Sequence, residues 1–286
     1  MRIFLPVVIL SFVLLSACER NNILTQNQWG RIFKKYGIDS ACFELADNTH
    51  DQILIYNLGH CSKRYSPAST FKIPNSLIAL ETNVAKDEKL VIPWDGIQRW
   101  NPEWSRDMDM REAFRVSCVP YYQEIARRVG PTEMQHWVDT MRYGNQRIGG
   151  AIDMFWLNDT LKISPDEQVG LIKKLYFDKL PFSQRSQRIV RSMMLREDST
   201  QYKLYYKTGT ALTDSSIQAW VVGFVERREV QKGIETKKEE TNYRPYFFAM
   251  HFETKDTAMD FRSARLNILK EILQERNIIP ANTAAK

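Results

Sequence analysis

The chain has 286 residues, of which 43% are hydrophobic and 12% aromatic, so it can bury the core of one compact domain. Its formal net charge is +6, but the charges are scattered along the chain, which does not indicate a nucleic-acid-binding protein. The four histidines show no spacing typical of metal ligands and no zinc motif is present, which argues against a metallo-hydrolase.

The N-terminus has the pattern of an export signal. Met1-Arg2 is a short positive start, and the apolar stretch from Ile3 to Leu15 is shorter than the roughly 20 residues that a spanning helix needs. The following Leu15-Ser16-Ala17-Cys18 resembles the lipobox of bacterial lipoproteins, whose cysteine is lipid-modified after cleavage. We therefore predict a signal peptide over residues 1–17, lipidation of Cys18, a polar tether over 18–28, and a periplasmic protein held to a bacterial membrane by its lipid. The alternative is ordinary signal cleavage nearby, with Cys18 incidental.

The first strands expected in the mature chain are Ser40–Leu45 and Gln52–Tyr56, which form a hairpin around Asp47-Asn48. Cys42 and Cys61 flank this hairpin. In an oxidising compartment they are candidates for a disulfide, and the sequence leaves open whether they pair or remain free thiols.

The segment Ser69-Thr70-Phe71-Lys72 opens an apolar, helix-compatible run. Positions three apart share one face of a helix, so the Lys72 amine can lie beside the Ser69 hydroxyl. Apolar neighbours lower the pKa of a lysine, which favours the neutral, basic amine. A serine hydroxyl needs an adjacent base to become a nucleophile. The motif therefore predicts a nucleophile and its base; an ordinary helix start with an exposed lysine is the alternative.

Two further motifs follow in the middle of the chain. Ser117-Cys118-Val119 ends a helix-compatible segment, and its serine supplies a second hydroxyl that can relay a proton. Cys118 is interpreted as a small buried apolar residue, with a reactive thiol as the alternative. Tyr143-Gly144-Asn145 comes next. Each motif is weak evidence alone, because a serine in a turn between helices is usually a cap.

Lys207-Thr208-Gly209 follows at the end of a predicted strand, Tyr202–Lys207. It supplies a cation and a backbone segment that a substrate can approach closely. The order of the four motifs along the chain carries more information than any one of them.

The remaining pattern predicts the fold. Residues 69–195 read as mostly helical, two more strands are expected at Ile217–Val225 and Tyr246–Phe252, and a terminal helix is expected at Thr257–Glu275. Strands at both ends of the chain imply an α+β fold in which an antiparallel sheet packs against helices, with a helical lobe inserted. The segment 226–244 mixes both signs of charge and is predicted to be an elongated, solvated hairpin.

These motifs resemble those of the class D (oxacillinase-type) serine β-lactamases, which share a transpeptidase-like fold. The resemblance extends over residues 29–286, which would form the domain. It is carried by the segments Pro67-Ala68-Ser69-Thr70-Phe71-Lys72-Ile73-Pro74-Asn75, Phe155-Trp156-Leu157, Lys207-Thr208-Gly209 and Trp220-Val221-Val222-Gly223. It implies hydrolysis of penicillins through a serine acyl-enzyme, and hence β-lactam resistance.

The resemblance also implies roles for the catalytic residues. Ser69 would attack the β-lactam carbonyl. Lys72 would be carboxylated by carbon dioxide and act as general base, with Trp156 donating its indole N–H to the carbamate. Ser117 would pass a proton to the leaving nitrogen, and Lys207 would attract the anionic substrate. Apart from carbon dioxide or bicarbonate, no cofactor and no metal are expected.

Substrate-binding residues are implied in the same way. The backbone N–H groups of Ser69 and Thr210 would form the oxyanion hole, and Thr208 and Gly209 would line the strand beside the substrate. Val119 and Leu157 would form an apolar lid over the carbamate. Arg262 would bind the substrate carboxylate as a planar fork; the alternative is a solvated arginine at the helix end, like Arg265.

Three rival functions stay open at this point. A β-lactam sensor domain and a peptidoglycan transpeptidase or carboxypeptidase would both be acylated without efficient turnover. A lipoprotein binding module with a degenerate site would not be acylated. The expected partners are small-molecule β-lactams and, through the lipid alone, a membrane; nucleic acid is not expected, and the protein would be a monomer or a homodimer.

Overall fold

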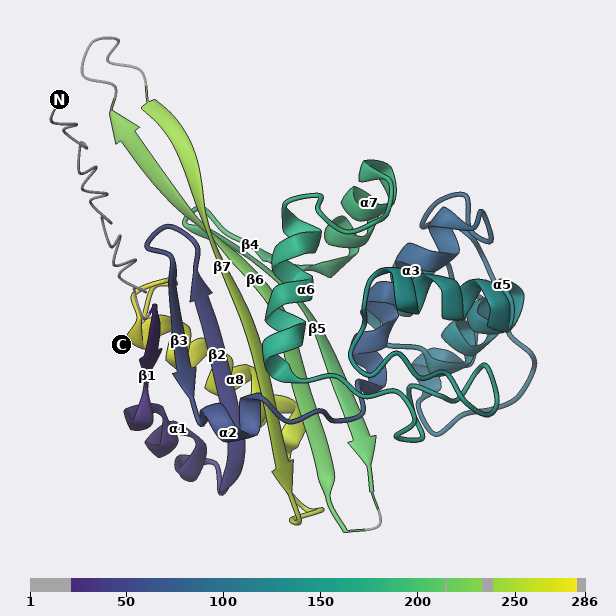
Figure 1. Cartoon of the computed structure of the whole chain (residues 1–286), viewed down its shortest axis with the longest axis horizontal. Coiled ribbons are helices and arrows are strands. Elements are labelled where there is room, and N and C mark those ends of the chain that lie inside the picture. The colour runs from purple at the N-terminus through teal and green to yellow at the C-terminus, as the bar shows by residue number, and fades with distance from the viewer. Residues whose placement is uncertain (1–21, 214, 233–238, 282–286) are drawn as a thin grey trace, which may run out of the picture.

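A seven-stranded sheet forms the centre of the computed structural model, which describes residues 22–213, 215–232 and 239–281 (Figure 1). The strand order is β1-β3-β2-β7-β6-β5-β4, and neighbouring strands are antiparallel except for the parallel pair β1 and β3. The strands are β1 (Ile23–Thr25), β2 (Ser40–Asp47), β3 (Gln52–Tyr56), β4 (Leu195–Asp198), β5 (Tyr202–Leu212), β6 (Ile217–Lys232) and β7 (Glu239–Thr254). The predicted α+β fold is confirmed.

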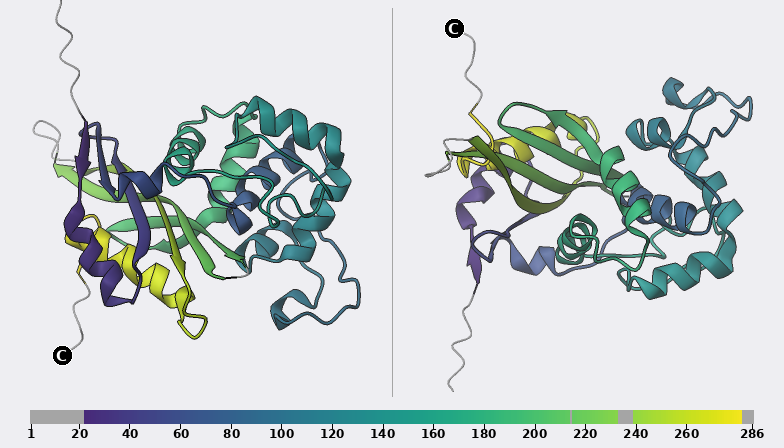
Figure 2. Two further views of the ribbon diagram at one scale, coloured as in Figure 1. Left: turned by 60° about the horizontal axis from the view of Figure 1, so that its bottom comes forward. Right: turned by 90° about the horizontal axis from the view of Figure 1, so that it is seen from above.

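Helices cover both faces of the sheet, as the views in Figures 1 and 2 show. On one face, α1 (Gly30–Lys35) and α8 (Phe261–Glu275) pack against the sheet; on the other lies α6 (Pro165–Tyr176). Successive side chains of a strand point to opposite faces. Val221 of β6 accordingly belongs to the core beneath α8, whereas its neighbour Val222 belongs to the core on the α6 side.

Most of the other helices form a lobe beside the sheet, inserted between β3 and β4 (Figure 2). The lobe contains α3 (Lys72–Glu81), α4 (Met110–Arg115), α5 (Val119–Thr140) and α7 (Gln184–Met194), with the short 3₁₀ helices η2 (Ala68–Phe71) and η3 (Pro102–Trp104). Outside the lobe, α2 (Leu58–Cys61) lies against β2, and the 3₁₀ helix η1 (Asn27–Trp29) leads into α1. Nine of the ten residues of α3, Lys72 to Leu80, are buried. A helix start buried in the core fixes the position of the side chains at its first turn.

Two predicted boundaries are wrong in an informative way. Strand β5 continues to Leu212 because β6 pairs with it along its whole length, so Lys207-Thr208-Gly209 lies inside the strand and not at its end. Helix α8 begins at Phe261, later than expected, because the Asp260 side chain accepts a hydrogen bond from the backbone N–H of Ser263 at 3.1 Å and caps it.

The N-terminal tether is corrected for residues 22–28. Residues Ile23–Thr25 form β1, which pairs in parallel with β3, and Asn27–Trp29 form η1, so this part of the chain belongs to the folded domain. The predicted signal peptide, Cys18 and the rest of the tether lie outside the described residues. Among those that are described, no helix combines the length and the apolar character needed to cross a bilayer.

Two further expectations are settled in the fold. Cys42 and Cys61 form a disulfide, with their Cα atoms 5.5 Å apart, and Cys118 is a buried free thiol. The charged hairpin is elongated as predicted, because β6 and β7 remain paired as far as Lys232 and Glu239. Its tip, residues 233–238, lies outside the described residues.

Candidate functional site

The turn that carries Ser69 is built by a tight local structure. Ala68 has the positive φ of 46°, unusual for a residue with a side chain, and the Thr70 hydroxyl donates to the carbonyl of Pro67 at 2.7 Å. Residues 68–71 form η2, which leads directly into α3. Lys72 Nζ donates a hydrogen bond to Ser69 Oγ at 2.8 Å, as the spacing of the two residues predicts.

The environment of Lys72 favours the neutral form of its amine. Its side chain is fully buried, and burial lowers the pKa of Lys72 from 10.5 to about 7. The Tyr122 ring lies 5.4 Å from Nζ. Among the described residues, no carboxylate pairs with Lys72. A large fraction of this lysine is therefore neutral at neutral pH and able to take a proton from the Ser69 hydroxyl.

A second lysine and serine pair is brought to the site from other elements. Lys207 Nζ of β5 donates to Ser117 Oγ at 2.9 Å and to the carbonyl of Thr208 at 2.9 Å. Ser117 has a φ of 59° in the turn between α4 and α5, a backbone conformation that is rare for serine. Burial, and then the charge of Lys72, lower the pKa of Lys207 well below 10.5. The two lysines therefore lie close enough to influence each other electrostatically.

Gly209 is the point at which β5 packs closely against the turn of Ser69. A Cβ atom at Gly209 would lie 3.0 Å from the carbonyl oxygen of Pro67 and 3.1 Å from Cγ2 of Thr70, closer than side chains normally pack. Only a glycine allows β5 and η2 to approach this closely. The neighbours Thr208 and Thr210 are half-buried on the same strand. The contact sets the distance between the Ser69 turn and the backbone of Thr210.

Trp156 lies behind the Ser69 turn. Its carbonyl accepts hydrogen bonds from the backbone N–H of Ala68 and from the Ser66 hydroxyl, both at 3.1 Å, and its ring stacks on Phe71 at 5.5 Å. The indole is completely buried, and its Nε1 has no hydrogen-bond partner within the described part of the chain. A buried donor without an acceptor is unusual, and among the described residues the indole N–H groups of Trp29 and Trp137 share this property. Leu157 and Val119 are half-buried.

Tyr143-Gly144-Asn145 does not join the cluster formed by Ser69, Lys72, Ser117 and Lys207. Gly144 has a φ of 51°, and a Cβ atom there would overlap the carbonyl oxygen of Lys162. Asn145 pairs with the backbone N–H of Lys162 at 2.9 Å and with the carbonyl of Thr160 at 2.9 Å. The motif therefore binds Thr160 and Lys162, at the end of the loop that carries Trp156, and its role is structural.

Arg262 is exposed at the start of α8, with its guanidinium 5.7 Å from the ring of Trp100, and it forms no ion pair with any described residue. Arg265, one turn later, was expected to be solvated. This expectation is wrong: Arg265 is 8% exposed, and its Nη1 donates to the carbonyl of Gly209 at 2.9 Å and to the Thr210 hydroxyl at 3.2 Å. Its spacing to Ile268 and Ile272 on the apolar face of α8 was the signal that could have revealed its burial.

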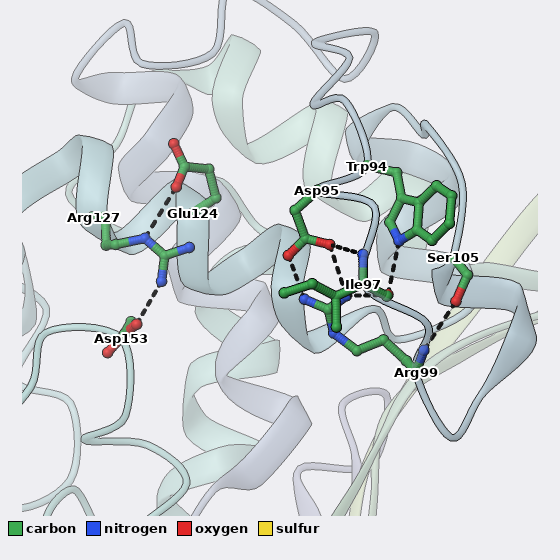
Figure 3. A network of polar contacts seen from close by, with 8 residues as sticks. All are labelled: Trp94, Asp95, Ile97, Arg99, Ser105, Glu124, Arg127 and Asp153. Atoms are coloured by element: carbon green, nitrogen blue, oxygen red, sulfur yellow. Dashed lines mark hydrogen bonds and ion pairs between the residues drawn. The ribbon is translucent and has the colours of Figure 1, made fainter.

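Trp100 belongs to a loop that is fixed by polar contacts (Figure 3). Arg99 pairs with Asp95 at 2.5 Å, and its backbone N–H donates to the Ser105 hydroxyl at 3.1 Å. On α5, Arg127 pairs with Glu124 at 3.0 Å and with Asp153 at 2.5 Å. The second network holds the start of the loop that carries Trp156 against α5.

A cavity of about 430 Å³ lies between the loop of Trp100 and α5. Arg99, Arg127 and Cys118 are among its lining residues. The two arginines are already paired with carboxylates, as described above. Burial raises the pKa of the Cys118 thiol, so Cys118 is a poor nucleophile.

Comparisons with known proteins agree with this geometry. The model of the penicillin-binding protein transpeptidase domain matches residues 26–273. The β-lactamase OXA-19 of Pseudomonas aeruginosa is 38% identical over 86% of this chain and 88% of its own length. The β-lactamase OXA-48 of Klebsiella pneumoniae is 40% identical over 78% of both chains. The crystal structure of a class D β-lactamase from Nostoc superimposes with a TM-score of 0.80 at 34% identity, covering 89% of this chain and all of that one.

Proposed function

Because the chain belongs to the class D β-lactamases, which are serine hydrolases that open the β-lactam ring, we propose that Ser69 is its nucleophile and Lys72 the site of its general base. The observation that carries this proposal is the 2.8 Å hydrogen bond between Lys72 Nζ and Ser69 Oγ. A base that is buried, neutral and in contact with a hydroxyl can accept its proton as the hydroxyl attacks.

The reaction has two halves. In the first, Ser69 Oγ forms a bond to the β-lactam carbonyl carbon and its proton goes to the base at Lys72. The ring C–N bond then breaks; Ser117 gives its hydroxyl proton to the leaving nitrogen and is reprotonated with the proton held by the base. In the second, the base at Lys72 takes a proton from water as the water oxygen attacks the ester carbonyl; the bond between that carbonyl carbon and Ser69 Oγ then breaks, and the base returns the proton to Ser69 Oγ. The N–H groups of Ser69 and Thr210 stabilise the negative oxygen in both halves. Losing one such donor typically costs roughly a hundredfold in rate.

We further propose that Lys72 is carboxylated by carbon dioxide, and that the carbamate, when formed, supplies the general base for both halves of the reaction. Only a neutral amine adds carbon dioxide, and burial lowers the pKa of Lys72 to about 7. The buried N–H of Trp156 lacks an acceptor among the described residues and would gain one. Val119 and Leu157, both half-buried, would limit the access of water to this group.

The substrate carries a carboxylate, and the proposed contacts for it are a lysine and an arginine. Lys207 is buried beside Ser117, and Arg262 is exposed at the start of α8 without a carboxylate partner among the described residues. Thr208 and Gly209 would line the same strand. Replacing Arg262 removes a bidentate contact and leaves the reacting atoms in place, so its loss should raise KM more than it lowers kcat.

Steady-state hydrolysis of benzylpenicillin, with and without added bicarbonate, tests the proposal. We expect sustained turnover that rises with bicarbonate. Turnover that is insensitive to bicarbonate, in a protein stripped of carbon dioxide at low pH, would contradict the carboxylation of Lys72. A single stoichiometric burst without turnover would show a sensor or transpeptidase in place of a hydrolase.

We also propose that the protein is exported and anchored by a lipid on Cys18, which rests on the sequence Leu15-Ser16-Ala17-Cys18. The test is metabolic labelling with a radioactive fatty acid in a bacterial host, comparing the natural chain with a Cys18→Ser variant. Label on the natural chain alone supports the anchor, and no label on either chain contradicts it.

A further inference from the structure

A second cavity, of about 340 Å³, lies on the α6 face of the sheet. Its walls come from β2, β3, α6 and the segment that follows α5. Helix α6 lies across the sheet there and packs on β2 and β7 (Figure 1). A cavity of this volume can hold a small organic molecule. None of Ser69, Lys72, Ser117 and Lys207 lines it, so it is distinct from the site described above.

Glu44 is the unusual residue of this cavity. Its side chain is 1% exposed, and it is the only buried acidic side chain among the described residues. Side chains alternate along a strand, and Ala46, two residues later, belongs to the core on the α6 side, so Glu44 points to the same face. The residues opposite Glu44, Ile55 of β3 and Ala249 of β7, are apolar. The carboxyl group therefore lies on an otherwise apolar part of the sheet.

No protein group neutralises this carboxyl group. Within the described part of the chain Glu44 forms no ion pair, and its Oε2 atom is buried without a hydrogen-bond partner. The charge that acts on it most strongly is that of Asp166, at the start of α6, which has the same sign. Burial, and then Asp166, raise the pKa of Glu44 to about 8. An apolar residue would match its neighbours at lower cost, so a structural role does not explain a carboxyl group here.

The apolar part of the lining restricts the kind of ligand. It consists of Ile53, Met141, Ile163, Val169, Leu171 and Leu180. The described histidine, cysteine, aspartate and glutamate side chains form no group of three that could hold a metal ion. These walls therefore suit a charge that is attached to an apolar body.

The other charged groups of the lining are more exposed than Glu44 and carry both signs. They are Asp47, Asp51, Asp166, Glu167, Arg142, Lys173 and Lys174. Glu167 is paired with Arg64, and Asp47 contacts His50 at 2.7 Å. Because these acidic and basic groups are solvated and largely offset one another, the buried Glu44 decides which sign of charge the interior favours.

We propose that this cavity binds a small primary amine with an apolar body, whose ammonium group donates to the Glu44 carboxylate. An ammonium group carries three N–H donors and no acceptor, so it neutralises Glu44 and satisfies its Oε2 atom together. Tyr143 also lines the cavity, and its buried hydroxyl likewise has no partner among the described residues. The site is independent of the proposed hydrolysis, because none of its residues is assigned a role in that reaction.

The test measures the affinity of the full-length natural protein for pentylamine by isothermal titration calorimetry. The matched ligands are 1-pentanol and pentanoate, which carry a neutral and a negative group on the same apolar body. At pH 8, pentylamine should bind roughly tenfold or more tightly than 1-pentanol, the gain expected from one hydrogen bond to a charged group, and pentanoate should bind more weakly than either. Equal affinities for pentylamine and 1-pentanol would contradict the inference.

The affinity should also depend on pH with a definite sign. The ammonium group binds ionised Glu44, and the pKa of Glu44 in the free protein is about 8, whereas an alkylamine stays protonated to about pH 10. The affinity for pentylamine should therefore rise roughly tenfold from pH 6 to pH 8 and level off at higher pH. The same affinity at pH 6 and pH 8 would show that Glu44 is not the group that binds.

Glu44→Gln keeps the shape of the side chain and removes its charge. This variant should bind pentylamine roughly ten- to a hundredfold more weakly at pH 8, lose the pH dependence and keep the kcat for benzylpenicillin. Glu133→Gln, which removes the same charge from an exposed position on α5, is the control and should bind as the natural protein does. Thermal melting establishes that both variants are folded; if Glu44→Gln is not, the ligand series and the pH dependence of the natural protein decide. Unchanged binding of pentylamine by folded Glu44→Gln would place the amine elsewhere and overturn the inference.

Discussion

The reactivity of Lys72 and its cost to stability have the same cause. The side chain is fully buried, so its charged form is poorly solvated, and the pKa of Lys72 falls from 10.5 to about 7. The protein gains a neutral amine beside Ser69. It loses stability in exchange, because the unfolded chain would keep the same amine protonated. Functional sites commonly carry such local instability.

We predict that Lys72→Met abolishes hydrolysis and stabilises the protein at pH 6. Methionine has similar length and no charge to desolvate, so the free energy of unfolding at pH 6 should rise by roughly 1–3 kcal/mol. Urea unfolding of both proteins at pH 6 measures this difference. Near-normal turnover of the variant would contradict the assignment of the base.

The same comparison has a pH dependence with a definite sign. Between about pH 7 and pH 10.5, the unfolded chain holds a proton on Lys72 that the folded protein has lost. Stability contributed by this group therefore rises with pH across that window. The advantage of Lys72→Met should shrink accordingly from pH 6 to pH 9. Lys207, whose pKa is also lowered, is present in both proteins and does not produce the difference.

At the scale of elements, the site is formed where three of them meet. The 3₁₀ turn η2 carries Ser69, the turn between α4 and α5 carries Ser117, and β5 carries Lys207. One hydrogen bond and one close backbone contact connect these elements: Lys207 to Ser117, and Gly209 to the carbonyl of Pro67, whereas the bond of Lys72 to Ser69 is local to η2 and the start of α3. The backbone contact is the one that a single methyl group would break.

We predict that Gly209→Ala lowers kcat roughly tenfold, because the added Cβ would lie 3.0 Å from the carbonyl of Pro67 and would push β5 away from η2 by a few tenths of an ångström. A displacement of about 1 Å can cost a hundredfold, and this smaller shift should cost less. Benzylpenicillin hydrolysis measures the effect. Gly170→Ala in α6 is the control: its Cβ meets no atom within 4 Å, so it should retain activity and gain roughly 0.5–1 kcal/mol of stability. Full activity of Gly209→Ala would mean that the contact does not set the geometry of the site.

Local motifs could be predicted from the sequence because their geometry is local. The distance between Ser69 and Lys72 follows from three residues of helix, and the alternation of β6 follows from the pleat. Contacts between distant segments could not be predicted. The burial of Arg265 depends on how α8 crosses β5, and the parallel pairing of Ile23–Thr25 with β3 depends on a free edge that only the folded sheet provides.

At the scale of the whole molecule, the disulfide joins two parts that meet beside the sheet. Cys42 lies in β2 and Cys61 ends α2, 19 residues later; with Ile55 they form a small buried cluster separate from the two large cores. The cluster lies at the point where the chain leaves the sheet to enter the helical lobe. Cys61 precedes Ser69 by eight residues, but neither cysteine contributes to the proposed reaction.

We therefore predict that the double variant Cys42→Ala/Cys61→Ala keeps the kcat of the natural protein but loses about 3 kcal/mol of stability, the amount expected for opening a loop of this length in the unfolded chain. Thermal melting with and without dithiothreitol measures the loss. The reductant should lower the melting temperature of the natural protein toward that of the double variant and leave the double variant unchanged, which serves as the internal control. Equal melting temperatures of the oxidised natural protein and the double variant would show that the disulfide does not stabilise the fold. If kcat also falls at a temperature where both proteins are folded, the cluster of Cys42, Cys61 and Ile55 supports the geometry of the site. The disulfide would then help to fix the position of the helical lobe relative to the sheet.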